Sequence, residues 1–374
     1  MRIGIITGEY PPMQGGVGAY TRILAHELAR QGHSIHLFSR AGTHDPDLPL
    51  AKAVARWNYG ALRAAARWTR ENRLDIVSLQ YQTAAYAMSP YIHFLPDALP
   101  APVVTTFHDL RYPYLFPKAG RLRDWIVMRL ARRSAGVIAT NHEDAARLND
   151  VPRRALIPIG SNILEPLPPD FDPAPYRAGA AASDLLIAYF GLINRSKGVD
   201  TLLDALHALR QDGVPARLVI VGGGAGSSDP TNAAYMAEIE AQIDRLKLRP
   251  FIHQTGYLDE RGVGATLSAA DVVALPFRDG ASYRRGSLMA AIRYACPIVT
   301  TIPTIDIPDF RDGINLLLCP PDQPSALAAA LRRLHESPGL RAALRREIAQ
   351  LAQAFEWNAI ARDTVEFYET VLKG

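Results

Sequence analysis

The hydrophobic pattern alternates between two kinds of segment along the whole chain. Short apolar runs rich in β-branched residues are typical of buried strands, and between them apolar residues recur at the spacing of one helix face. Strands that alternate with helices predict an α/β fold with parallel sheets wound on both faces. The strands are predicted at 2–7, 34–39, 75–80, 102–108, 136–141, 155–160, 185–191, 217–223, 251–256, 271–277, 297–301 and 315–320.

Turn residues delimit two of the predicted helices. Apolar residues between Val17 and Leu28 fall on one helix face, and Gly32 is the expected stop. Asp200 is expected to cap a second helix, which ends before Gly213. Both helices follow a predicted strand, as the alternation requires.

A proline-rich segment divides the series of strands into two halves. Residues 164–176 contain five prolines, which predict a stiff and extended connector. We therefore expect two Rossmann-like domains, at 1–165 and 177–354, which face each other across a cleft. Residues 355–374 form a final amphipathic pattern.

Composition narrows the class of protein without choosing a ligand. The chain has 374 residues, 48% of them hydrophobic and 21% charged, which is ordinary for a soluble protein. A net charge of +4 suits an anionic substrate, nucleic acid or an acidic membrane equally, although the aromatic and basic interleaving of a nucleic-acid binder is missing. The two cysteines lie in apolar segments, and neither a secretory signal nor a spanning helix is expected, so we predict a cytoplasmic protein.

Candidate site residues of the first half follow its strands, because ligands of open α/β sheets bind beyond the carboxyl ends of the strands. Gly15 and Gly16 would let a ligand approach the backbone, and the amides of the next helix suit an anion. The alternative is a tight turn that needs a positive φ. His108, followed by Asp109, could donate a hydrogen bond to a sugar hydroxyl or stabilise developing charge; the alternative is a structural histidine.

Cations and helix starts follow two strands of the second half. Lys197, with Arg195 nearby, directly precedes a predicted helix, and this arrangement suits a phosphate. Arg285 stands before a helix that begins at Gly286 and Ser287, which adds free backbone amides to the positive charge. The alternative is a set of solvated or structural cations.

Two other motifs are interpreted as surface features. Asp45 and Asp47 match an Asp-x-Asp metal motif, but no second cluster of ligands accompanies them, and no metal is expected. The glycine-rich residues 222–230 lack the ending of a phosphate-binding loop and are predicted to be a flexible surface loop.

The basic stretch 120–134 has two open interpretations. Trp125, Ile126 and Leu130 are predicted to share one face of a helix that is surrounded by arginines. Such a helix could lie on an anionic membrane, or it could pack on the first domain with its arginines outward.

Several motifs in a fixed order resemble one family. The segments EYPPMQGGVGAYT, FHD, LIPIGSN, FGLINRSKGVDTLL, LVIVGGG and CPIVTT together resemble glycosyltransferase family 4, retaining enzymes of the GT-B fold that use nucleotide sugars. The resemblance covers essentially the whole chain. It implies that the final helix, 355–374, crosses back to the first domain.

The resemblance also implies roles for individual residues. It implies that Gly15 and Gly16 form the loop near the donor diphosphate and the acceptor, and that His108 contacts the transferred sugar. It also implies that Lys197 binds the diphosphate and that the nucleotide base rests on the turn at Tyr257 and Leu258.

Three positions depart from the pattern of the family. Leu192 stands where the family usually has an arginine, and Ser282 and Ala290 stand where it has the Glu-x7-Glu pair. We expect Arg285 to replace the missing arginine and Asp279 to stand in for the acid that faces the sugar.

The sequence therefore predicts a retaining transfer of sugar from a nucleoside-diphosphate donor to an acceptor hydroxyl on a glycan, a lipid-linked carrier or a small molecule. No metal is required, and peripheral contact with the inner face of the membrane fits the basic stretch. The alternatives are a catalytically degenerate GT-B protein that serves as a binding partner, and a GT-B sugar-nucleotide epimerase or phosphorylase.

Overall fold

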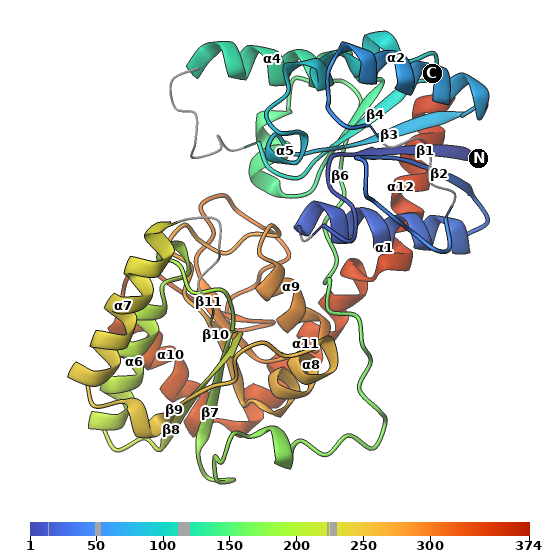
Figure 1. The fold of residues 1–374 in the computed structure, drawn as a ribbon. Helices are drawn as coiled ribbons and strands as arrows, with labels where there is room; N and C mark the ends of the chain where they lie inside the picture. The colour runs from blue at the N-terminus through green and yellow to red at the C-terminus, as the bar shows by residue number, and fades with distance from the viewer. Residues whose placement is uncertain (14, 49–53, 111–119, 223, 225–229) are drawn as a thin grey trace. The chain divides into compact units, whose positions relative to one another are not determined.

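The computed structural model describes residues 1–13, 15–48, 54–110, 120–222, 224 and 230–374. The chain divides into two compact units. The first comprises Met1–Asn162 and Glu356–Gly374, and the second comprises Ile163–Phe355. Each unit contains a six-stranded sheet (Figure 1).

The first unit is a doubly wound sheet in which every pairing is parallel, with the strand order β2-β1-β3-β4-β5-β6. Helices α1 and α12 cover one face, and α2 and α4 cover the other (Figure 1). The strands are β1 Arg2–Thr7, β2 Ser34–Phe38, β3 Ile76–Tyr81, β4 Val103–Phe107, β5 Gly136–Ala139 and β6 Arg154–Leu156; the helices are α1 Gly16–Arg30, α2 Tyr59–Glu71, α3 Leu95–Ala98, α4 Gly120–Arg133, α5 His142–Arg147 and α12 Trp357–Leu372.

The second unit repeats this plan with the order β12-β11-β10-β7-β8-β9. Helices α6, α7 and α10 lie on one face, and α8, α9 and α11 lie on the other (Figure 1). The strands are β7 Leu185–Gly191, β8 Ala216–Gly222, β9 Ile252–Gln254, β10 Val272–Leu275, β11 Ile298–Thr301 and β12 Leu317–Cys319; the helices are α6 Val199–Gln211, α7 Pro230–Arg245, α8 Glu260–Ala269, α9 Gly286–Arg293, α10 Pro324–Glu336 and α11 Pro338–Ala352.

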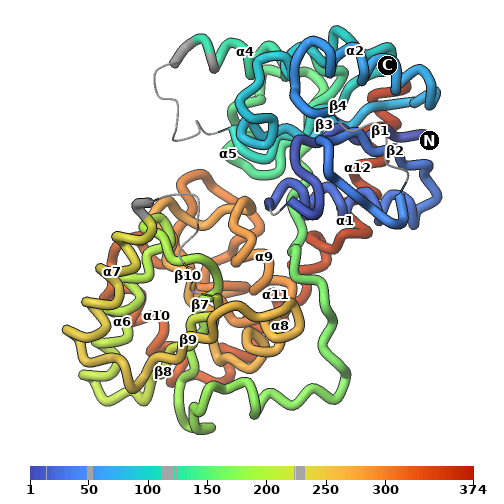
Figure 2. Tube along the Cα trace, viewed as in Figure 1, coloured from blue at the N-terminus to red at the C-terminus, as the bar shows by residue number. Residues whose placement is uncertain are grey.

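The C-terminal helix α12 belongs to the first unit, where it lies beside α1 (Figure 2). Trp357, at its start, contacts the ring of Tyr20 on α1 with the ring centroids 5.2 Å apart. The indole Nε1–H of Trp357 donates to the carbonyl oxygen of Ser161 at 2.7 Å. Aromatic packing and this buried hydrogen bond attach the end of the chain to its beginning.

The predicted fold class is confirmed, and each of the twelve predicted strands is present. One helix cap is wrong. Asp200 does not cap α6, because the N-cap is Gly198 and the Asp200 side chain in the first turn accepts hydrogen bonds from neighbouring elements. The stop at Gly32 is confirmed by its φ of +86°.

Helix α4 does not present the predicted apolar face. Leu130 is fully buried, whereas Trp125 is 56% exposed, so the two side chains lie on different sides of the helix. Among the described arginines of α4, Arg129 and Arg133 pair with Asp97.

Cys296 and Cys319 are both buried, and neither forms a disulfide. Among the residues that the structure describes, no helix combines the length and the apolar content that crossing a bilayer requires.

Each sheet has a point at which the direction of winding reverses. In the first unit β1 lies between β2 and β3, and in the second β7 lies between β8 and β10. The reversal falls between β1 and β3 in the first sheet and between β7 and β10 in the second. The connections on the two sides of such a point leave in opposite directions, so a crevice opens at the carboxyl ends of these two neighbouring strands. The loops that follow β7 and β10 are therefore the first place to look for a site in the second unit.

Candidate functional site

The loop after β7 positions Lys197 next to the loop after β10. Lys197 ends a short 3-10 helix, Arg195–Lys197, and is followed by Gly198 in the left-handed region with a φ of +67°. A Cβ atom at Gly198 would lie 2.1 Å from the carbonyl oxygen of Pro276, so only glycine allows the two loops to approach this closely. The backbone contact places Lys197 beside the residues that follow β10.

Lys197 and Arg285 meet on the ring of Phe277. The Lys197 Nζ lies 5.0 Å from the ring centroid and the Arg285 Cζ lies 4.8 Å from it. Arg285 is the N-cap residue of α9, and Lys197 Nζ reaches the hydroxyl of Ser287 in the first turn at 3.5 Å. The first N–H groups of α9, from Gly286 on, have no partner within the helix, so two cations and a helix N-terminus converge.

The charges at this site are unevenly compensated. Asp279 forms an ion pair with Arg285, whereas no carboxylate pairs with Lys197 in the part of the chain that the structure describes. Burial, and then the Arg285 charge, lowers the pKa of Lys197 to about 8. Most of the Lys197 population is therefore still charged at pH 7, in a site that holds more positive than negative charge.

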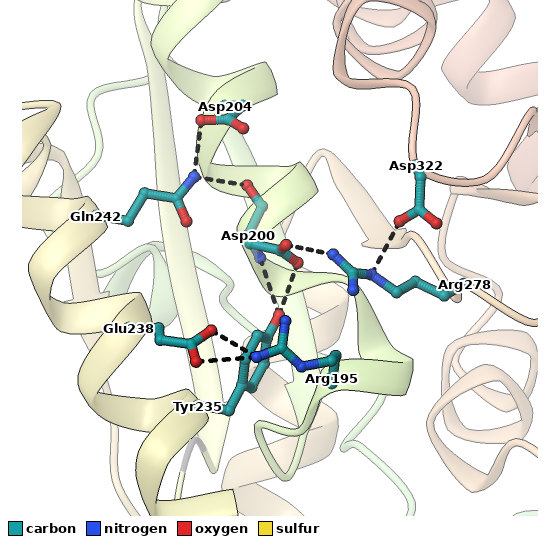
Figure 3. A network of polar contacts seen from close by, with 8 residues as sticks. All are labelled: Arg195, Asp200, Asp204, Tyr235, Glu238, Gln242, Arg278 and Asp322. Atoms are coloured by element: carbon teal, nitrogen blue, oxygen red, sulfur yellow. Dashed lines mark hydrogen bonds and ion pairs between the residues drawn. The ribbon is translucent and has the colours of Figure 1, made fainter.

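Arg195 does not join this group, although the sequence suggested that it would. Its guanidinium donates to both carboxylate oxygens of Glu238, at 2.9 and 2.7 Å, and lies over the ring of Tyr235 (Figure 3). Arg195 therefore pairs with a carboxylate on α7 and packs on Tyr235, not on Phe277.

A polar network connects the loop after β7 to the loop after β10. Arg278 bridges Asp200 and Asp322, and the Tyr235 hydroxyl donates to Asp200 at 2.6 Å (Figure 3). The backbone N–H of Arg278 donates to the carbonyl oxygen of Ser196 at 3.0 Å. Arg278 thus ties the loop that carries Lys197 to the loop that carries Asp279 and Arg285.

The residues that stand in place of the family's two glutamates are small and buried. Ser282 is 1% exposed and Ala290 is 0% exposed. A carboxylate at either position would be largely removed from water, which is costly without a partner. Leu192, where the family has arginine, is by contrast 52% exposed.

The predicted base site has one exposed and one enclosed residue. Tyr257 is 93% exposed, so its ring is available for stacking. Leu258 lines a pocket with His253, Thr255 and Thr266, on the α8 side of the strands β8 and β9. Residues 223 and 225–229 of the nearby glycine-rich loop lie outside the described residues.

In the first unit, His108 directly follows β4. Its ring nitrogen Nε2 lies 2.9 Å from the Gln80 Oε1 atom, and its ring meets the edge of Tyr20 with a centroid separation of 4.6 Å. Burial lowers the pKa of His108 to about 3. The ring is therefore uncharged at neutral pH and supplies no positive charge.

The turn at Gly15 and Gly16 holds a carboxyl group of the chain itself, that of Glu9. A Cβ atom at Gly15 would lie 2.1 Å from a carboxylate oxygen of Glu9, and this carboxylate accepts a hydrogen bond from the Gly18 amide. The alternative of a positive φ is wrong, because Gly15 is extended at −178° and Gly16 begins α1. Gly15 is required for space, and burial raises the pKa of Glu9.

The interpretation of Asp45 as a surface residue is wrong. Its side chain is 0% exposed and accepts hydrogen bonds from the Tyr10 hydroxyl, from His26 at 3.0 Å and from the Asp47 amide at 3.0 Å. His26, Asp45 and Asp47 have ligand atoms within 4.8 Å of one another, close enough for one ion to reach all three. The short polar loop hid this burial, because the partners come from residues up to 35 positions away.

Sequence reasoning missed Phe277, on which both cations lie. The signal was an aromatic residue at the end of the predicted strand 271–277, just before a basic loop. It also missed Gln80, since a polar residue inside a strand has no signature until its partners are known.

Two family models match the chain, one in each unit. The model for Glycosyltransferase Family 4 matches residues 14–161, and the model for Glycosyl transferases group 1 matches residues 184–337. Among the relatives, a phosphatidyl-myo-inositol mannosyltransferase of Mycolicibacterium smegmatis is 24% identical, with 99% of this chain and 94% of the relative covered. A D-inositol 3-phosphate glycosyltransferase of Kineococcus radiotolerans is 27% identical, with 96% and 91% covered.

Solved structures share the fold over the full length. HepE of Anabaena, solved in complex with UDP, has a TM-score of 0.78 at 18% identity, with 99% of this chain and all of HepE covered. Sucrose-phosphate synthase of Thermosynechococcus elongatus has a TM-score of 0.74 at 21% identity, with 100% and 99% covered.

The two doubly wound units have the GT-B fold. Since the two family models together span most of both units, the chain belongs to the group 1 glycosyltransferases with a family 4 N-terminal domain.

Proposed function

We propose that this glycosyltransferase moves a sugar from a nucleoside-diphosphate donor to an acceptor hydroxyl, with retention at the anomeric carbon. One observation carries the proposal: Lys197 and Arg285 meet on Phe277, at the start of α9 and beside the switch point of the second sheet. A diphosphate is the group that such a concentration of positive charge and free amides suits best.

The chemistry follows from where the charge develops. The bond between the anomeric carbon and the diphosphate oxygen breaks, and the acceptor oxygen forms the new bond on the same face of the sugar. The acceptor proton passes to an oxygen of the leaving diphosphate. Lys197, Arg285 and the amides of Gly286 and Ser287 stabilise the negative charge as it grows, and one well-placed donor of this kind contributes about 3 kcal/mol.

Asp279 has a separate role in this proposal. Its ion pair holds the guanidinium of Arg285 at Phe277 in the unliganded protein. When the diphosphate engages Arg285, the carboxylate of Asp279 becomes available to accept a hydrogen bond from the donor sugar, the role of the missing family acid.

The transfer needs no metal, because the two cations and α9 supply the positive charge that a divalent ion would otherwise provide. Turnover is expected to be unchanged by EDTA. A loss of activity in EDTA that Mg²⁺ or Mn²⁺ restores would overturn this part of the proposal.

A panel of UDP, GDP, TDP and ADP sugars tests the function. We expect one nucleotide to raise the melting temperature by mass action, and its sugar to be released in an assay for free nucleotide. Arg285→Gln should weaken binding of that nucleotide by about tenfold or more, because it removes a charge-assisted contact.

Arg195→Gln is the matched control, since Arg195 is a nearby arginine that pairs with Glu238. It should leave the affinity unchanged. Silence across all four sugar classes would instead favour a degenerate binding protein, and an equal loss in both variants would remove the assignment of Arg285.

We propose that the acceptor is a carbohydrate or a lipid-linked carrier, and that α4 makes peripheral contact with the inner face of the membrane. Trp125 and Leu122 are 56% and 69% exposed on this helix. Because Arg129 and Arg133 are paired with Asp97, the contact rests mainly on these apolar side chains. Trp125→Ser should reduce sedimentation with anionic vesicles; unchanged sedimentation would refute the contact.

A further inference from the structure

A buried chain of hydrogen bonds in the first unit ends at His108. The hydroxyl of Tyr368 on α12 donates to the Ser78 Oγ atom at 2.7 Å, and the side-chain amide nitrogen of Gln80 donates to the same oxygen at 2.8 Å. The Gln80 Oε1 atom lies 2.9 Å from Nε2 of His108. Ser78, Gln80 and Tyr368 are all 0% exposed.

The strand geometry explains why these groups meet. Ser78 and Gln80 are two positions apart on β3, so their side chains lie on the same face of the sheet. Thr106 is the register partner of Gln80 on β4, and its hydroxyl is the second oxygen near the Gln80 nitrogen, at 3.5 Å. Both protons of the Gln80 amide therefore have hydroxyl oxygens within reach, and its carbonyl oxygen is directed to His108.

The placement of the Gln80 amide bears on where the imidazole proton lies. Its nitrogen lies towards the Ser78 and Thr106 hydroxyls and its oxygen towards the ring, and because an amide oxygen can only accept, this placement puts a hydrogen on Nε2 of His108. The ring is uncharged at neutral pH and has one N–H group, which leaves Nδ1 with a lone pair. Among the residues that the structure describes, Nδ1 has no hydrogen-bond partner.

The ring is also held in orientation. The backbone N–H of His108 donates to the carbonyl oxygen of Tyr81 at 3.1 Å, and Tyr20 contacts the ring edge-on. A fixed ring with a fixed tautomer presents one defined acceptor atom.

We propose that Gln80 is a positioning residue that holds His108 as its Nε2–H tautomer, so that Nδ1 accepts a hydrogen bond from a hydroxyl of the sugar substrate. The proposal rests on the proposed sugar transfer for the identity of the hydroxyl, but the tautomer itself is a property of the unliganded protein. It reverses the expectation from sequence that His108 donates to the sugar. A glutamate in place of Gln80 would favour the charged imidazolium, which cannot accept, so an amide is the side chain that this role requires.

Long-range ¹H–¹⁵N spectra of the imidazole groups test the assignment without substrate. The chain has ten histidines, and the signals of His108 are identified by their loss in His108→Asn. We expect the Nε2–H tautomer in the native protein. Gln80→Leu should release it into a mixture of tautomers and lower kcat/KM for transfer by about fivefold or more, the effect of one lost hydrogen bond.

Gln80→Glu keeps an acceptor at the same position and should move the titration of His108 to higher pH in the same spectra. It also preserves the test if the leucine variant does not fold. Tyr368→Phe is the matched control: it removes the far end of the chain, so it should lower stability while the His108 tautomer stays unchanged.

An Nδ1–H tautomer in the native protein would overturn the proposal, because the Gln80 nitrogen would then face the ring. An unchanged tautomer in Gln80→Leu, or an unchanged titration in Gln80→Glu, would do the same. If the tautomer is as expected but no nucleotide sugar is turned over, the sugar transfer fails and with it the role of Nδ1, while the control of the tautomer by Gln80 stands.

Discussion

Replacing Lys197 by methionine should change stability and ligand binding in opposite directions. Methionine keeps an unbranched apolar stem against Phe277 and removes only the charge. In the unliganded protein this charge is buried next to Arg285 and has no carboxylate partner in the described part of the chain. Its removal should therefore stabilise the empty protein, although it removes a contact on which the bound diphosphate depends.

The lowered pKa sets the size of the effect on stability. A change from 10.5 to about 8 corresponds to about 3 kcal/mol of unfavourable interaction of the charged lysine in the folded state. Because the pKa in the folded state lies below that in the unfolded state, the unfolded chain binds more protons between pH 8 and 10.5. Stability should rise with pH across this window, and the cost is fully present below about pH 8.

Urea denaturation and inorganic pyrophosphate make the test independent of the unknown nucleotide. Lys197→Met should raise the free energy of unfolding by up to about 3 kcal/mol at pH 7 and abolish the rise that Lys197 contributes between pH 8 and 10.5. Its affinity for pyrophosphate should fall about 10- to 100-fold, since a charge-assisted hydrogen bond is worth about 1.5 to 3 kcal/mol. Arg195→Met, in the same turn but paired with Glu238, should do neither.

A variant that is less stable than the native protein, or one that binds pyrophosphate with unchanged affinity, would refute the reasoning. The first result would mean that the lysine has a stabilising partner, and the second would mean that the phosphates bind elsewhere.

Three further experiments test the fold of the two units. Gly198→Ala forces a side chain against the Pro276 carbonyl at a φ of +67° and should cost at least about 2 kcal/mol in urea unfolding, whereas Gly213→Ala, at +79° with open space around it, should cost about 1 kcal/mol. Trp357→Phe removes the buried hydrogen bond from the indole to the carbonyl of Ser161 and should lower stability by about 1 kcal/mol, read from the same unfolding curves. Burial raises the pKa of the two cysteine thiols to about 12 and about 11, so a thiol reagent should label neither until urea unfolds the chain.

The strands could be predicted from sequence because burial on both faces leaves a local signature. Parallel strands covered by helices become continuous runs such as the apolar residues of β7 and β10, and the loops between them are rich in glycine and proline. The cap of α6 was mispredicted for a related reason. Aspartate is a residue type that often caps helices. The carboxylate of Asp200 is instead bound by Arg278 and Tyr235, and neither of these is near it in the sequence.

Only part of the candidate site could be predicted from the sequence, because the sequence does not show which side chains pair with one another. That cations follow β7 and β10 can be read from the chain, since the carboxyl ends of the strands are set by their order. Which cations point together cannot be read, because the outcome depends on the carboxylate with which each one pairs: Arg195 pairs with Glu238 on α7, 43 positions away, while Arg285 pairs with Asp279, six positions away.

The departures from the family pattern are consistent with one another as a single rearrangement of charge. In the proposed site, Arg285 from the loop after β10 takes the place of the cation that leucine at 192 removes from the end of β7. A cation placed there, with a side chain 13% exposed, needs a nearby acid in the empty protein, and Asp279 provides it. Ser282 and Ala290 are both buried, so a glutamate at either position would have to be accommodated away from water. Restoring the family residues one at a time should therefore harm this protein, and only the joint exchange of 192, 279, 282, 285 and 290 should reproduce the usual site.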